Sequence, residues 1–231
     1  MAGSGKAHMR PDGDIVLTVE DLTVEFKLGK DKIVKAVSGV SFDLVRGETL
    51  AVVGESGCGK STLGKAILQL PKPNSGSVNF LSTELTTLGK KELRDMRPAM
   101  QMIFQDPYSS LNPRMTVLDI IGEGLALKGI ARADIQDEVG FWLRRVGLHP
   151  DHMSRFPHEF SGGQRQRIGI ARAMIIKPKF LNTTSLLTSR CVPISISVSP
   201  VATRASVSLI CLLDLKRLMY STLQGKAANR S

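Results

Sequence analysis

The chain has 231 residues, of which 42% are hydrophobic and 23% charged, values typical of a globular protein with a substantial core. No uncharged apolar run approaches the roughly 20 residues that span a bilayer, and residues 1–14 contain no apolar stretch typical of a signal peptide. The formal net charge is +10, but no aromatic platform accompanies the basic C-terminal part, so we expect no nucleic-acid partner.

The N-terminal part of the chain is expected to be flexible over residues 1–14 and then to form β-strands. Its apolar residues are β-branched or alternate with polar ones, and Gly, Asp and Lys residues separate the short segments. The expected strands span residues 15–19, 22–26, 40–44 and 49–53.

The segment after the last of these strands matches the phosphate-loop pattern G-x-x-x-x-G-K-[ST] in full. A strand that ends in a glycine loop and opens a helix presents backbone N–H groups to phosphates. The Lys60 ammonium is placed to contact the β- and γ-phosphates, and the Ser61 hydroxyl to ligate Mg²⁺. We therefore expect this loop to bind a nucleoside triphosphate. Its residues are Gly54, Glu55, Ser56, Gly57, Cys58, Gly59, Lys60, Ser61 and Thr62.

The chain then alternates between helix and strand. Proline residues after position 70 end the helix that the phosphate loop opens, and a charged segment between two apolar runs predicts a second helix. The expected elements are a helix at 61–70, a strand at 77–81, a helix at 90–96 and a strand at 101–104.

Residues 106–160 are expected to form an inserted helical subdomain. Thr116 can cap a helix over residues 117–127, and apolar residues recur at helical spacing over residues 133–146. Trp142 and the methionines of this part are expected to pack in its core rather than to contact a ligand.

A second motif, Ser161, Gly162, Gly163 and Gln164, opens an expected helix over residues 165–176. A serine and glycines at a helix N-terminus form an anion site, because a hydroxyl and backbone N–H groups point outward. Two such helix starts in one chain suggest a nucleotide held between two subunits. For the serine alone, a plain helix cap is the alternative.

With these motifs the chain resembles the ATP-binding subunits of ABC transporters. Residues 54–62 match the family's Walker A loop, Gln105 matches its Q-loop, and residues 160–164 match its signature. Phe26 lies where the family places an aromatic residue that stacks on adenine, and a core position is an equally good interpretation. The chain has no Asn-Lys-x-Asp motif, which favours ATP over GTP.

Residues 104–114 and 156–160 narrow the resemblance to the oligopeptide and dipeptide importers, with nickel importers close behind. The resemblance covers about residues 15–181. It implies an α/β fold, that of a P-loop NTPase with an ABC-type nucleotide-binding domain. This domain would have an N-terminal β-subdomain and an inserted α-helical subdomain, and the C-terminal part of its core would be missing or replaced.

The same resemblance implies roles and partners. Lys60 and the loop backbone would hold the ATP phosphates, Ser61 and Gln105 would bind or sense Mg²⁺, and residues 161–164 would contact ATP held on a partner subunit. The implied partners are a second ABC ATPase subunit bound head-to-tail, transmembrane permease subunits and, indirectly, a substrate-binding protein. The implied location is the cytoplasmic face of the cell membrane, where three cysteines without metal or disulfide spacing are expected to stay reduced.

The resemblance stops at about Leu181. The family next requires a strand ending in Asp-Glu and, later, a histidine, but residues 182–185 read Asn-Thr-Thr-Ser and all four histidines precede the signature. We therefore assign no catalytic residue and expect negligible hydrolysis of ATP. The missing strand should lie beside the phosphate-loop strand, and its loss should expose that strand's flank and put cooperative folding in doubt.

Residues 182–231 differ from the rest in composition, with six basic residues but one acid and no glutamate. A change of reading frame at about codon 181 accounts for this abrupt onset, and a divergent but genuine C-terminus is the alternative. The segment is expected to form long disorder or an improvised strand.

Two other functions remain open at this point. A non-catalytic partner in a mixed dimer would still offer its Walker A loop to one site and its signature to the other. A soluble ABC-type protein of translation or DNA repair would be indicated by two tandem nucleotide domains or a coiled-coil insertion, and the chain shows neither.

Overall fold

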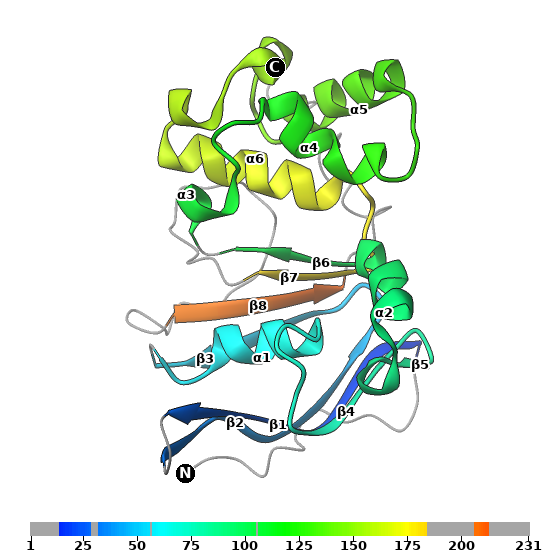
Figure 1. Ribbon diagram of the computed structural model, residues 1–231, viewed down its shortest axis with the longest axis vertical. Helices are drawn as coiled ribbons and strands as arrows, with labels where there is room; N and C mark the ends of the chain where they lie inside the picture. Colours follow the sequence, from blue (N-terminus) through cyan, green and yellow to red (C-terminus); the bar gives the residue numbers. More distant parts are fainter. Residues whose placement is uncertain (1–13, 29–31, 56, 105, 184–205, 213–231) are drawn as a thin grey trace, which may run out of the picture.

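The computed structural model describes residues 14–28, 32–55, 57–104, 106–183 and 206–212. Two β-sheets and a group of helices are stacked along the long axis of the molecule (Figure 1). The first sheet has the order β2 (Lys32–Val45), β1 (Ile15–Leu28), β4 (Ser75–Phe80) and β5 (Thr83–Glu84). The second has the order β3 (Thr49–Gly54), β8 (Ser206–Leu212), β7 (Phe180–Thr183) and β6 (Met100–Ile103).

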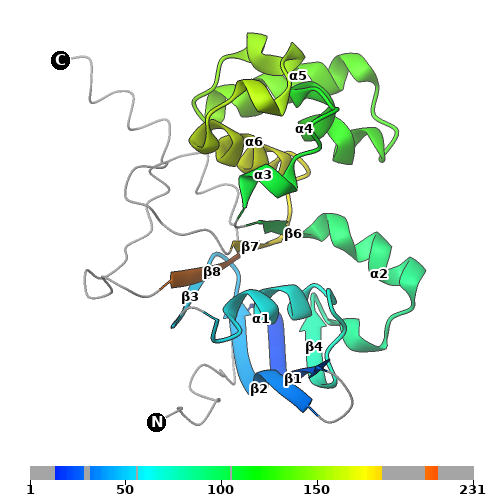
Figure 2. The same cartoon turned by 60° about the vertical axis from the view of Figure 1, so that its left-hand side comes forward.

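The helices lie on both sides of the second sheet. α1 (Lys60–Ile67) lies between the two sheets, whereas α3 to α6 form a separate layer beyond β6 (Figures 1 and 2). The helices of this helical layer are α3 (Pro107–Ser110), α4 (Val117–Ala126), α5 (Arg132–Arg145) and α6 (Gly162–Met174). α2 (Lys90–Met96) has no buried residue, and the short 3₁₀ helices are η1 (Leu85–Thr87), η2 (Arg97–Ala99), η3 (Pro150–Ser154) and η4 (Pro157–Glu159).

The two strands expected at 15–19 and 22–26 are one strand, β1, with a local break. Asp21 adopts the left-handed backbone conformation (φ 45°), and its N–H donates to the Ser41 hydroxyl at 2.8 Å instead of continuing the ladder. The pairing with β2 shifts register between Val19 and Leu22 as a result. A short polar side chain tolerates this conformation, so the strand can continue past the irregularity.

The helical layer has its own hydrophobic core. Thr116 caps α4 as predicted, because its hydroxyl accepts the N–H of Asp119. That hydroxyl also donates to the Asp119 carboxylate at 2.6 Å, and together with Arg132 it lowers the pKa of Asp119. Trp142 is buried among the apolar residues of α4, α5 and α6, which confirms its predicted place in the core.

The expectation of an open flank beside the phosphate-loop strand is wrong. β8 comes from the part of the chain that departs from the family pattern, yet it pairs antiparallel with β3 on one side and with β7 on the other. β3, β7 and β6 all run in the opposite direction to β8 and end at the same edge of the sheet (Figure 1). A strand from outside the family pattern, β8, therefore joins β3 to the pair formed by β7 and β6.

Asn182 belongs to β7, and its polar side chain is buried against α1. It is 0% exposed, and neither its amide nitrogen nor its oxygen has a hydrogen-bond partner among the described residues. A Cβ built on Gly64 of α1 would lie 2.0 Å from the amide nitrogen, so a larger residue there would require the Asn182 side chain to move. Burying an amide without a partner costs about 1–3 kcal/mol.

Replacing Asn182 by leucine should therefore stabilise the protein by about 1–3 kcal/mol, because leucine has nearly the same shape and no polar atoms to desolvate. Chemical denaturation followed by circular dichroism measures the change. Asn79→Leu, at a half-buried position of β4, is the control and should bring no gain. An unchanged or lower stability of Asn182→Leu would mean that the amide is satisfied in solution.

Candidate functional site

The predicted phosphate loop lies between the end of β3 and the start of α1. Gly57 and Gly59 have φ values of 84° and 94°, which side chains other than glycine rarely adopt. A Cβ on Gly59 would also lie 1.9 Å from the Ala36 carbonyl oxygen of β2. The loop therefore takes its course because glycine allows both the turn and the close approach of β2. Ser56 lies outside the described residues.

The Lys60 side chain contacts three other residues of the loop. Its ammonium donates to the carbonyl oxygens of Gly54 at 2.8 Å and Glu55 at 2.5 Å, and it lies 3.3 Å from the Cys58 sulfur. The residue is 9% exposed, so this charge is held inside the loop rather than in solvent. Its carbonyl partners can be exchanged for phosphate oxygens, which are stronger acceptors.

The start of α1 suits an anion. Gly59 occupies the cap position, and as glycine it offers no side chain to cap the first-turn N–H groups. Ser61 and Thr62, in the same turn, are half-buried. Such a turn, with a lysine beside it, fits a triphosphate and a magnesium ion held by a hydroxyl and phosphate oxygens.

Within the described part of the chain, no three His, Cys, Asp or Glu side chains gather in a group that could hold a metal ion. Ser61 is the one predicted metal ligand that the structure places, and Gln105 lies outside the described residues.

Phe26 is not a core residue. Its side chain is 41% exposed at the end of β1, opposite Val34 of β2. Val34 is two residues before Ala36, the residue that approaches Gly59, a separation of about 7 Å along a strand. An exposed aromatic ring therefore lies on the strand pair next to the phosphate loop. Sequence reasoning missed Val34 and Ala36, because only tertiary packing brings β2 to the loop.

The second motif forms the start of α6. The Ser161 hydroxyl accepts the Gln164 N–H at 3.3 Å, and the Gln164 side chain accepts the Ser161 N–H at 3.0 Å, a reciprocal capping box. The helix thus begins at Gly162, three residues earlier than predicted. Ser161 and Gly163 are exposed, and a Cβ on Gly163 would meet nothing within 4 Å.

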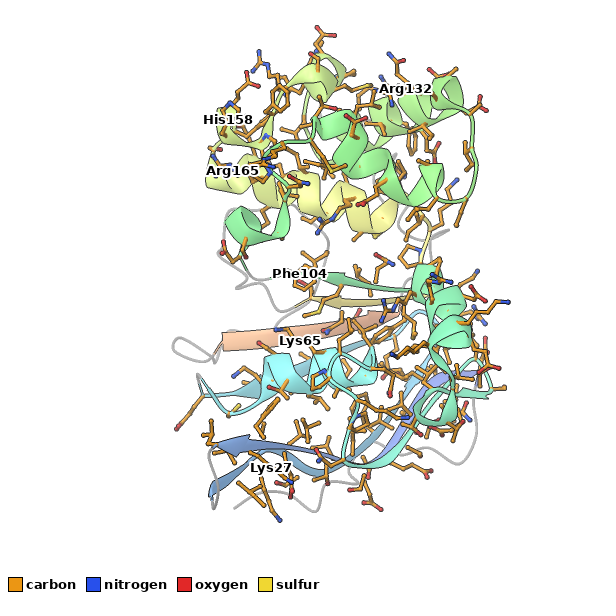
Figure 3. The ribbon with its side chains drawn as sticks, viewed as in Figure 1. Lys27, Lys65, Phe104, Arg132, His158 and Arg165 are labelled. Carbon is orange, nitrogen blue, oxygen red and sulfur yellow. The ribbon has the colours of Figure 1, made fainter. Side chains whose placement is uncertain are left out.

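One chain does not bring the two motifs together. Strands β8, β7 and β6 separate α1 from α6, although both helices begin on the side where β3, β6 and β7 end (Figure 1). Figure 3 places Arg165 near the beginning of α6, in the helical layer, and Lys65 on α1, in the lower part of the molecule. Within one chain the two motifs therefore lie in different layers of the molecule.

Comparisons with known proteins agree on one family. The sequence profile described as "ABC transporter" matches residues 37–182. The chain is 52% identical over 171 residues to the putative oligopeptide transport ATP-binding protein YkfD of Bacillus subtilis, covering 72% of this chain and 51% of that protein. It is 49% identical over 177 residues to the oligopeptide transport ATP-binding protein OppF of Salmonella typhimurium, covering 72% and 53%.

The chain thus spans about half the length of the curated relatives that it matches. Among solved structures, the ATP-binding cassette MJ0796, a dimer in a post-hydrolysis state bound to ADP and Pi, is 26% identical with a TM-score of 0.61, over 71% of each chain. CbiO1 of Clostridium perfringens, part of the ABC transporter complex cbiONQ, is 28% identical with a TM-score of 0.59, covering 73% of this chain and 64% of that one.

None of the helices in the described residues is long and apolar enough to cross a membrane. The fold is the P-loop NTPase fold of these solved neighbours, and the profile match covers more than half of the sequence. The chain belongs to the ABC transporter family.

Proposed function

We propose that this chain is the ATP-binding, energy-coupling subunit of an importer of oligopeptides or dipeptides. The observation that carries the proposal is the phosphate loop, in which Lys60 is held over Gly54 and Glu55 and the start of α1 is left uncapped. The names of the relatives support the peptide substrate, since they are oligopeptide, dipeptide or tripeptide transport proteins.

In this proposal the loop binds ATP with Mg²⁺. Lys60 and the N–H groups of the loop hold the β- and γ-phosphates, and the Ser61 hydroxyl ligates the ion, with Gln105 as a further ligand or sensor. Phe26 stacks on the adenine ring, which an exposed aromatic side chain beside the loop allows.

The exposed start of α6 serves a second subunit. Ser161, Gly162, Gly163 and Gln164 contact ATP that is held by the phosphate loop of a head-to-tail partner, either another copy or a related ABC ATPase. The dimeric form of the solved neighbour MJ0796 supports such an arrangement. Transmembrane permease subunits, fed by a substrate-binding protein, would hold the pair at the cytoplasmic face of the cell membrane.

We further propose that this polypeptide binds ATP without hydrolysing it by itself. No Asp-Glu pair follows Phe180, and no histidine follows the signature. Both groups would normally help to position and polarise the attacking water. In a mixed dimer the signature of this chain would then complete the site of a partner that can hydrolyse ATP. Adding this chain to that partner should therefore change the partner's ATPase rate.

The first test is equilibrium binding of a fluorescent methylanthraniloyl derivative of ATP with Mg²⁺. Lys60→Met should weaken binding by about 10- to 100-fold, because a charge-assisted contact of about 1.5–3 kcal/mol is lost. Lys65→Met, on the exposed side of the same helix, is the matched control and should bind like the wild type (Figure 3). Equal binding by the Lys60 variant, or no binding by the wild type, would contradict the proposal.

The origin of residues 182–231 is tested separately, by reading the DNA across codons 175–190 in all three frames. If another frame encodes the missing strand that ends in Asp-Glu, the reading frame has changed in a gene for a hydrolytic subunit. If no frame contains it, the non-hydrolytic partner in a mixed dimer becomes the leading interpretation.

A further inference from the structure

Three arginines of α6 each donate to a backbone carbonyl of a different segment. Arg165 reaches Pro157 at 2.7 Å and Arg167 reaches Gly147 at 3.4 Å, both within the helical layer. Arg172 reaches the carbonyl of Ser110 at 2.6 Å, at the end of α3. α3 is the first element of the helical layer after the chain leaves β6, so this third bond lies where the layer is attached.

The helical layer is joined to the second sheet at two places in the described chain, from β6 to α3 and from α6 to β7. The first crossing lies against one side of α6. A small cavity there is lined by Ile103, Phe104 and Ser110 from the crossing and by Arg165, Gly169 and Arg172 from α6. The hydrogen bond from Arg172 to Ser110 lies at this cavity and links the crossing to α6.

The Arg172 guanidinium is partly withdrawn from water. Burial lowers its pKa, and the nearby carboxylate of Glu123 opposes that shift. A partly buried, charged donor at 2.6 Å from a carbonyl makes a strong hydrogen bond. Losing its acceptor would leave a partly desolvated donor without this hydrogen bond, so the geometry of the crossing is tied to that of α6.

We propose that Arg172 is a positioning residue that fixes α3, and with it the first crossing, against α6. In doing so it sets the orientation of the helical layer, including the exposed Ser161 end of α6, relative to the phosphate loop. The inference rests on the proposed function in one respect, since bound nucleotide at the loop is the reference point for that orientation.

Energy transfer from Trp142 to methylanthraniloyl-ATP tests the orientation. Trp142 is the single tryptophan of the chain and is buried in the helical layer, whereas the acceptor binds at the phosphate loop. Arg172→Met should change the transfer efficiency while the affinity for the nucleotide stays within about twofold of the wild type, because the loop itself is untouched. Arg167→Met removes a similar bond inside the layer and should leave the efficiency unchanged.

Hydrogen exchange provides a readout that needs no nucleotide. Amides of residues 108–112 should exchange about tenfold faster in Arg172→Met than in the wild type, while those of α5 should not change. Arg172→Lys keeps the charge and a donor, so it should restore part of the protection, and it serves as the folded variant if Arg172→Met proves unstable.

The proposal is overturned if both Arg172 variants match the wild type in transfer and exchange, or if Arg167→Met shifts them equally. A wild-type protein that binds no nucleotide would instead defeat the proposed function. The exchange of residues 108–112 would still decide the role of Arg172 in that case.

Discussion

Replacing Gly59 by alanine should destabilise the protein by about 2–5 kcal/mol and abolish nucleotide binding. The added Cβ would lie 1.9 Å from the Ala36 carbonyl oxygen, which is part of the β2 backbone and cannot move aside as a flexible side chain could. Overpacking of this kind costs about 1–3 kcal/mol, and the left-handed conformation at φ 94° adds about 1–2 kcal/mol for any residue with a Cβ.

Gly57→Ala is the matched control for this prediction. Gly57 has a similar φ of 84°, but a Cβ there would meet nothing within 4 Å, so only the conformational cost of about 1–2 kcal/mol applies. Denaturation midpoints of the two variants, with binding of the fluorescent ATP derivative, measure the difference. If the two variants were equally stable, the contact between β2 and the loop would have no energetic weight.

The parts of the fold that the sequence predicts best are those governed by local chemistry. The glycines around Lys60 predict the loop because few other residues can adopt its backbone, and Thr116 predicts the start of α4 because its hydroxyl caps the helix. The sequence predicts the start of α6 three residues too late. Gly162 and Gly163 are weak helix formers, and the capping box of Ser161 and Gln164 compensates for this.

Contacts between distant segments could not be predicted in this way. The approach of Ala36 to Gly59 and that of Asn182 to Gly64 depend on how strands and helices pack, and no local pattern marks them. The pairing of β8 is the largest difference. The sequence analysis expects at most one strand somewhere in residues 182–231 and does not locate it, whereas the strand in the sheet is formed by residues 206–212.

The second large effect is expected for Ile210→Pro in β8. Ile210 has a strand on each side, since it pairs with Leu50 of β3 and with Asn182 of β7. Proline has no N–H to donate and its ring disrupts the ladder, so it is confined to edge strands and bulges. We expect a loss of stability on the order of 3 kcal/mol and rapid hydrogen exchange at residues 50–53 of β3, the strand that leads into the phosphate loop.

Ile210→Val is the control, because it keeps the N–H group and a high preference for β-structure. It should leave both the stability and the exchange of β3 close to those of the wild type. If Ile210→Pro also leaves the amides of β3 protected from hydrogen exchange, the sheet does not depend on β8. The nucleotide site is then supported by the part of the chain that resembles the family, about residues 15–181, alone. If β3 loses protection, a strand from outside the family pattern holds the phosphate loop in place, and any loss of ATP binding in this variant follows from the sheet rather than from Lys60.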